Sequence, residues 1–120
     1  QTEIQNNNTN NEEFVEVQKD GTRVNTSNKL KENKEIDGLN ITNINLQTKG
    51  NETVLVANVE NRTNEKKGDY EINIIAKDKN GKEIKKIGGY INLTKPGEIT
   101  ILRVKTSFDF ANTYDIEITK

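Results

Sequence analysis

Carboxylates are the side chains in this chain that could support chemistry, because it contains 19 Asp and Glu but no His and no Cys. The lack of both removes the usual nucleophile–base pairs and the usual zinc, iron and copper ligands. Acid–base catalysis needs carboxylates held in a desolvated cleft. Most acids here lie in expected loops or at solvent-facing strand positions: Glu52, Asp69, Asp78, Glu98, Asp115 and Glu117. We therefore expect no enzyme and no catalytic residue; a hydrolase that uses paired carboxylates is the alternative.

The tetrad Asp78-Lys79-Asn80-Gly81 resembles half of a calcium-binding loop. The remaining carboxylates at EF-hand spacing, and the closing Glu, do not follow it. An Asn-Gly pair between two β-prone runs is typical of a tight turn. We expect a turn at this position, and neither a metal ion nor another cofactor.

The side chains most suited to contact a partner are Tyr90, which follows a double glycine, and three basic residues of a polar loop, Arg62, Lys66 and Lys67. The net charge is −1, with 18 basic and 19 acidic residues interspersed along the chain. A nucleic-acid-binding protein usually shows a strongly basic face, so no nucleic-acid partner is expected. No apolar run approaches the roughly 18 residues that a membrane helix requires.

The composition indicates a β domain that must position these residues. Only 30% of the residues are hydrophobic, and fourteen of them are Ile, whereas Ala occurs three times. Branched side chains favour pleated sheet over helix, and short runs of alternating polarity recur between turn signals. We predict one antiparallel two-sheet β-sandwich, immunoglobulin-like, of seven or eight strands over residues 13–120, preceded by a polar, Asn-rich tail or linker at residues 1–12.

The central element of the predicted sandwich is a hairpin from Leu39 to Asn61, whose second strand should lie inside its sheet. Ile41 and Ile44 are out of phase, which predicts a bulge or a crossing between sheets near Thr42-Asn43. Upstream, an Asp-Gly turn predicts a hairpin over residues 14–25, with Phe14 and Val24 facing the core. Residues 27–38 read as an irregular connection with room for one helical turn.

Two features of the second half carry further expectations. Paired glycines inside a strand usually mark a bulge or a sharp bend, which we expect at Gly88-Gly89. Residues 107–112 could form one short helical turn, with Phe108 or Phe110 closing the end of the sandwich. Six Asn residues begin an Asn-x-Ser/Thr pattern, the acceptor pattern for N-glycosylation: Asn7, Asn25, Asn40, Asn51, Asn61 and Asn92. Because the chain is rich in Asn, we expect that these patterns arise from its composition and are not glycosylation sites.

The strands and turns from Leu39 to Ile118 resemble the FxLYD-type, immunoglobulin-like lipoprotein domains, small exported β-sandwich domains of Gram-positive bacteria. The matching stretches are LNITNINL, TVLVANVEN, KDKNGKEI, the KPGE turn and the closing TYDIEI. FVEVQKDGTRVNTSNKL is similar to the leader of an uncharacterised clostridial branch. The aromatic-x-Leu-Tyr-Asp signature itself is replaced by IIAKD, which keeps only Asp78.

The resemblance implies an extracellular or membrane-anchored location on the cell surface, and no established activity. We therefore expect a non-catalytic module of the cell envelope, or a secreted one, that contacts an envelope protein or polymer or spaces other domains. The alternative hydrolase would then act in the same envelope. The chain begins at Gln1 rather than Met, which predicts a fragment or a processed form. Membrane contact is expected only through an N-terminal tether outside this chain.

Overall fold

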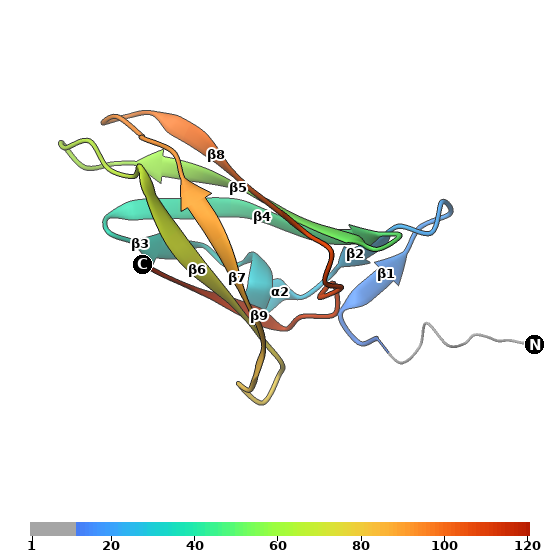
Figure 1. Ribbon diagram of the computed structural model, residues 1–120. Coiled ribbons are helices and arrows are strands. Elements are labelled where there is room, and N and C mark those ends of the chain that lie inside the picture. Colours follow the sequence, from blue (N-terminus) through green and yellow to red (C-terminus); the bar gives the residue numbers. More distant parts are fainter. Residues whose placement is uncertain (1–11) are drawn as a thin grey trace, which may run out of the picture.

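The computed structural model describes residues 12–120, in which nine strands and one short helix form (Figure 1). Their bounds are β1 Val15–Val17, β2 Arg23–Asn25, α2 Asn28–Lys31, β3 Lys34–Ile36, β4 Leu39–Lys49, β5 Glu52–Asn61, β6 Tyr70–Lys77, β7 Glu83–Ile91, β8 Ile99–Thr106 and β9 Asp115–Thr119. The strands alternate buried and exposed residues, as the sequence periodicity predicts.

The strands form two antiparallel sheets, which confirms the predicted fold class. The larger sheet has the order β1-β2-β4-β5-β8, with β3 pairing the other half of β4, and the smaller sheet has the order β7-β6-β9. The chain changes sheets after β5, after β7 and after β8. In the larger sheet β5 pairs with both β4 and β8, and in the smaller sheet β6 pairs with both β7 and β9. Nine strands form rather than the expected seven or eight. The added strand is β3, which lies within residues 27–38, expected to be an irregular connection, and pairs with β4.

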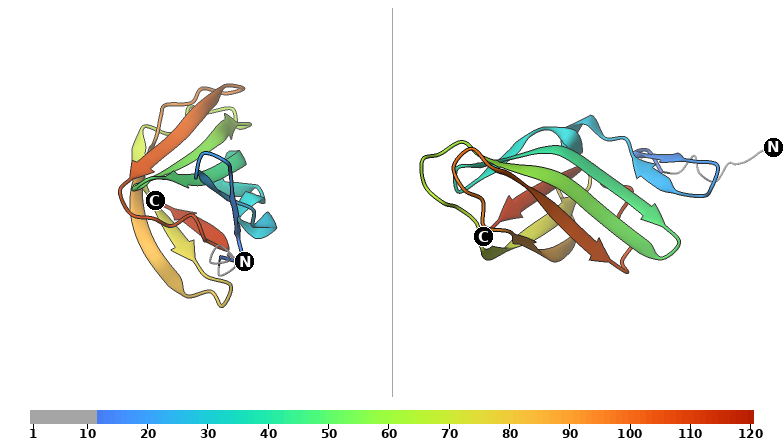
Figure 2. Two further views of the ribbon diagram at one scale, coloured as in Figure 1. Left: turned by 90° about the vertical axis from the view of Figure 1, so that its right-hand side faces the viewer. Right: turned by 90° about the horizontal axis from the view of Figure 1, so that it is seen from above.

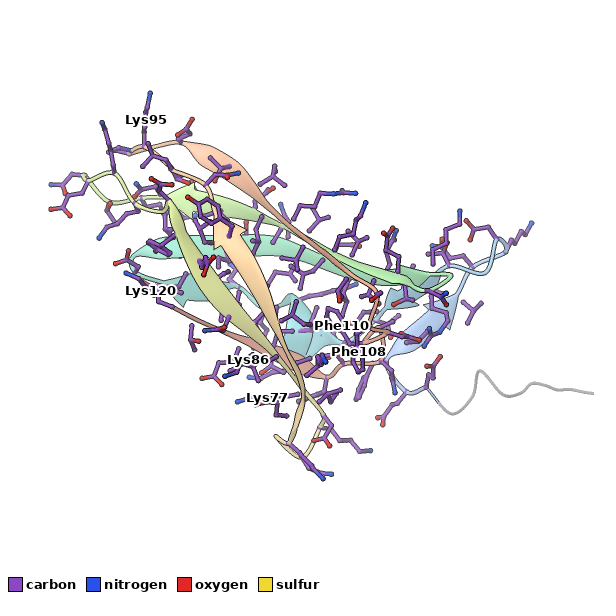
Figure 3. All side chains as sticks on the ribbon, viewed as in Figure 1. Lys77, Lys86, Lys95, Phe108, Phe110 and Lys120 are labelled. Carbon is purple, nitrogen blue, oxygen red and sulfur yellow. The ribbon has the colours of Figure 1, made fainter. Side chains whose placement is uncertain are left out.

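Figure 2 shows the two sheets as two layers that enclose the core, with β7 of the smaller sheet beside β8 of the larger one. Apolar side chains from both layers meet between them. The buried cluster comprises Leu30, Ile36, Leu39, Ile41, Ile44, Leu46, Leu55, Ala57, Val59, Ile72, Ile74, Ala76, Ile87, Ile91, Leu102, Val104, Phe110 and Ile116. Phe110 closes the end of the sandwich, as predicted, while Phe108 stays 38% exposed beside it (Figure 3).

The central hairpin forms as predicted. β4 and β5 pair from Leu39↔Asn61 to Lys49↔Glu52, and the register shifts between Thr42 and Asn45. Asn43 takes a positive φ of 53° at this shift, which is the extra residue that brings Ile44 back to the core face. β5 lies between β4 and β8, so its central position is also confirmed.

The N-terminal hairpin docks through a different residue from the one expected. Val24 faces away from the core and is half-buried, whereas Asn25 is completely buried. The Asn25 side-chain amide donates to the carbonyl oxygens of Ala111 and Thr113, both at 2.7 Å. Phe14 also lies outside the core cluster: it is half-buried, and its ring packs 5.3 Å from that of Tyr114. The expectation for Val24 was wrong because the alternation was read by hydrophobicity alone, and a polar side chain fills the inward position.

The helical turn expected at residues 107–112 is absent, since this described segment is irregular. Its polar groups bond to other parts of the fold: the Phe110 amide donates to Thr53 Oγ1, and the Ala111 carbonyl accepts from Asn25. The helical turn allowed within residues 27–38 does form, as α2, with Ser27 accepting from the Leu30 amide as N-cap.

The predicted tail at residues 1–12 lies outside the described residues except for Glu12, whose carboxylate pairs with Arg23. In the described range no helix has the length and apolar character needed to span a bilayer.

Candidate functional site

The double glycine lies inside a regular strand, so the bulge or bend expected there was wrong. β7 pairs with β6 through Ile72↔Gly89 and Asn73↔Gly88, and the register shift lies instead at Ala76/Lys77. A Cβ on Gly89 would lie 3.1 Å from Val104 Cγ2 and 3.3 Å from Ile74 Cδ1. The missing side chain at Gly89 therefore lets β8 approach β7, which brings an edge strand of each sheet side by side.

Gly88 has the opposite role, because it faces outward. A Cβ at Gly88 would meet no atom within 4 Å. The outer surface is hollowed around this position, with a volume of about 570 Å³. We call this depression the glycine hollow; it is lined by Glu71, Ile72, Asn73, Gly88, Gly89, Tyr90, Arg103, Val104, Lys105 and Lys120. Its wall residues come from β6, β7 and β8 and from the residue after β9, so regular strands rather than loops position it.

Strand register extends the glycine hollow across the smaller sheet. Gly88, Asn73 and Thr119 lie opposite one another on β7, β6 and β9 and form one row of small or short side chains. The neighbouring row on one side contains Tyr90 opposite Glu71. The row on the other side contains Lys86 of β7, Ile75 of β6 and Glu117 of β9, with Ile75 paired to both of the others. Rows of larger side chains thus flank a row that begins at a glycine.

Tyr90 forms one wall of the glycine hollow and is 45% exposed. Its hydroxyl donates a hydrogen bond to the carboxylate of Asp69. This bond to an anionic acceptor raises the pKa of Tyr90 above its usual value. The ring is consequently fixed at its outer end while its face remains open to solvent.

Asp69 is held in place by the turn before β6. Its φ is 65°, its amide donates to the Ile91 carbonyl at 2.7 Å, and Gly68 beside it has a φ of 94°. A Cβ on Gly68 would collide with the backbone carbonyl of Asn92, so only glycine fits there. The strained turn therefore fixes the carboxylate that orients Tyr90.

Basic side chains surround the glycine hollow. Arg103 and Lys105 are exposed residues of β8. Lys120 follows β9 (Figure 3). Arg103 forms no ion pair with any residue of the described range 12–120, and Lys105 Nζ lies a distant 3.7 Å from Glu52. Lys120 Nζ lies 4.3 Å from the centroid of the Tyr70 ring. Glu71 is the one acidic side chain among the described lining residues.

The predicted contact residues of the polar loop lie outside the glycine hollow. Arg62 pairs with Glu60 at 3.0 Å, and Lys67 pairs with Asp37 at 3.4 Å. The Lys67 backbone also exchanges two hydrogen bonds with Thr94. Lys66 is exposed. Arg62 and Lys67 thus have contacts within the fold, and of the four predicted contact residues Tyr90 alone lines the hollow.

Sequence reasoning missed Arg103, Lys105 and Asn73. Alternation along β8 places Arg103 and Lys105 on its outer face, but no sequence signal shows that this face meets β7. The pair of glycines was the available signal: two adjacent residues without side chains permit a close approach on one face and leave a hollow on the other.

The acids do not form a metal-binding group, since the described residues contain no cluster of three or more suitable ligands. Asp78 adopts the predicted turn, where its Oδ1 accepts from the amides of Asn80 and Lys82, both at 2.9 Å.

Comparison of the chain with protein-family models, with curated proteins and with solved structures finds no match in any of the three.

Proposed function

We propose that this chain is a non-catalytic binding module whose ligand, a polymer or protein of the cell envelope, occupies the glycine hollow. The observation that carries the proposal is the fixed Tyr90 ring beside an open hollow of about 570 Å³ on regular strands. An aromatic ring presents a large contact surface, and little conformational freedom is lost when a partner covers it if the ring is already held. Polar groups of Asn73 and Glu71 lie within reach of the same ligand.

A carboxylate-dependent hydrolase is the alternative, and the geometry favours it less. Glycoside hydrolysis, for example, uses two carboxyl groups about 5–9.5 Å apart on either side of the scissile bond. The described lining of the glycine hollow offers Glu71 without a second acid. Two acids elsewhere are engaged by neighbours: Asp109 pairs with Arg23, and Asp37 accepts from Tyr70 and Lys67.

An extracellular or membrane-anchored location belongs to the same proposal. Its support is the sequence: the polar, Asn-rich residues 1–12 and the resemblance to the exported FxLYD-type domains. An open depression on a rigid β domain suits a ligand that is already extended and immobile, as a wall polymer is.

Capture of the protein by envelope material tests the proposal. Gly88→Leu should fill the hollow without strain, because Gly88 lies in a strand and its Cβ position is open. The matched control is the loop variant Arg62→Ala/Lys66→Ala. We expect wild type and loop variant to sediment equally with insoluble envelope polymers or to capture the same envelope proteins, and Gly88→Leu to lose capture.

Three outcomes would contradict the proposal. Equal capture by Gly88→Leu would remove the hollow as the site. Absence of capture by the wild type would favour a spacer with no ligand. Turnover of a glycan or peptide library, abolished by one Asp or Glu substitution in a folded protein, would establish the hydrolase.

A further inference from the structure

The charge around the glycine hollow differs from that of the whole chain. Its lining side chains include three basic residues and one acidic residue, a formal balance of +2, whereas the chain as a whole carries −1. Lys86 adds another exposed cation on β7, two residues before Gly88 (Figure 3). The strands β5 and β9 carry only acidic charged residues and β8 only basic ones, so the basic excess is local to this surface.

Three of these cations come from two strands that belong to different sheets and become neighbours only when the two sheets pack together. β8 supplies Arg103 and Lys105, β7 supplies Lys86, and the close packing at Gly89 brings the two edges together. Arg103 and Lys86 pair with no acid in residues 12–120, whereas Lys105 Nζ lies 3.7 Å from Glu52. A guanidinium can bind a carboxylate or phosphate through two parallel hydrogen bonds.

Tyr90 and Asn73 restrict which anion fits. A half-exposed phenol ring offers an apolar face to the C–H face of a sugar, and an amide can donate to and accept from hydroxyl groups. The row Gly88–Asn73–Thr119 continues from the hollow across three strands, which suits an extended chain rather than a compact anion.

We infer that the ligand of the glycine hollow is an anionic glycan, a sugar polymer that carries carboxylate or phosphate groups. A sugar ring packs on Tyr90 above Gly88, and the anionic groups pair with Arg103 and Lys105. This inference rests on the proposed binding function and adds the chemical class of the ligand. The carboxylate and phosphate forms share the same recognition chemistry, and separate probes distinguish them.

The test uses labelled polymers with a common backbone: neutral dextran, carboxymethyl-dextran and dextran phosphate, with polyglutamate as an anion without sugar. Binding to the full chain is followed by fluorescence anisotropy. We expect at least one anionic dextran to bind about tenfold more tightly than neutral dextran, since only the anionic polymer can form the two exposed charge pairs. Polyglutamate offers the charges without a sugar ring to pack on Tyr90, so it should bind more weakly than that anionic dextran. Added salt should weaken that binding through screening.

Two variants with the same change of charge locate the site. Arg103→Gln/Lys105→Gln should lose roughly tenfold in affinity for the anionic dextran, while Arg62→Gln/Lys66→Gln should match the wild type. Gly88→Leu should abolish binding. Circular dichroism melts of all variants check that the substitutions, which lie at exposed positions, leave the fold intact.

The outcomes separate this inference from the proposed function. Neutral dextran that binds as tightly as the anionic forms, and is lost in Gly88→Leu, overturns the anionic class and keeps the binding function. Polyglutamate binding as tightly as carboxymethyl-dextran overturns the glycan. Anionic binding that both Gly88→Leu and Arg103→Gln/Lys105→Gln retain overturns the inference and the hollow together, and absence of binding to either anionic dextran overturns the inference.

Discussion

Asn25 and Asn61 have the same structural role at opposite ends of the larger sheet: each is completely buried and bonds to two loop carbonyls through its side-chain amide. In each case Oδ1 accepts from the amide two residues later, at 2.9 Å, which closes an Asx-turn. Both residues belong to Asn-x-Ser/Thr patterns, so these two patterns specify turns. A buried asparagine with both side-chain atoms engaged leaves no room for a glycan.

Substitution of Asn25 by Ala should lower the free energy of unfolding by about 3 kcal/mol. The change removes three hydrogen bonds and leaves buried polar groups of Ser27, Ala111 and Thr113 without partners. Urea denaturation followed by far-ultraviolet circular dichroism measures the effect. Asn28→Ala, at an exposed position three residues later, is the control and should change stability by less than about 0.5 kcal/mol. Equal stability of the two variants would show that Asn25 does not fasten the N-terminal hairpin.

The sequence predicted the parts of the fold that local pattern determines. Out-of-phase Ile41 and Ile44 located the bulge, and the Asp-Gly and Asn-Gly pairs located turns. It failed where a polar residue takes an inward position, as Asn25 does, because hydrophobic alternation assigns the inside to Val24. It could not predict the glycine hollow, since the approach of β7 to β8 depends on packing between sheets. Tyr90 was predicted as a contact residue because it follows two glycines, and it lines the hollow. Arg103 also lines the hollow but was not predicted, because it resembles any solvated strand residue.

The two adjacent glycines of β7 should respond oppositely to the same substitution. Gly89→Ala places a methyl group 3.1 Å from Val104 and 3.3 Å from Ile74, both buried, and should cost about 1–3 kcal/mol as overpacking. Gly88→Ala points into open space and should leave stability unchanged or raise it by up to about 1 kcal/mol, since it restricts the unfolded chain. Chemical denaturation of both variants gives the comparison. A larger loss for Gly88→Ala than for Gly89→Ala would contradict the assigned inward and outward faces.

Phe110 and Phe108 stack with their ring centroids 6.5 Å apart, yet only one of them should matter for stability. Phe110 is 3% exposed, so Phe110→Ala leaves a cavity at the end of the sandwich and should cost about 3–5 kcal/mol. Phe108 is 38% exposed, and Phe108→Ala should cost less than about 1 kcal/mol. Thermal melts of the two variants test this difference. Similar melting temperatures would mean that Phe110 does not close the core.

The raised pKa of Tyr70 should make the stability of the fold depend on alkaline pH. Burial, reinforced by the hydrogen bond that its hydroxyl donates to Asp37 at 2.9 Å, raises the pKa of Tyr70 from 10.0 to about 12. A raised pKa in the folded state means that this stabilisation is complete below pH 10 and is lost as the pH rises toward 12. Between these values the unfolded chain releases the phenolic proton and the folded protein keeps it, so the free energy of unfolding must fall.

Ultraviolet titration isolates this group, because phenolate absorbs where phenol does not. The wild-type titration minus that of Tyr70→Phe should show a single step with its midpoint near 12. In urea denaturation at rising alkaline pH, Tyr70→Phe should lose stability less steeply than the wild type. A difference step near pH 10, with equal slopes for the two proteins, would show that Tyr70 is not held as a phenol between the sheets. Lys67 and Lys120, which also face Asp37, are present in both proteins.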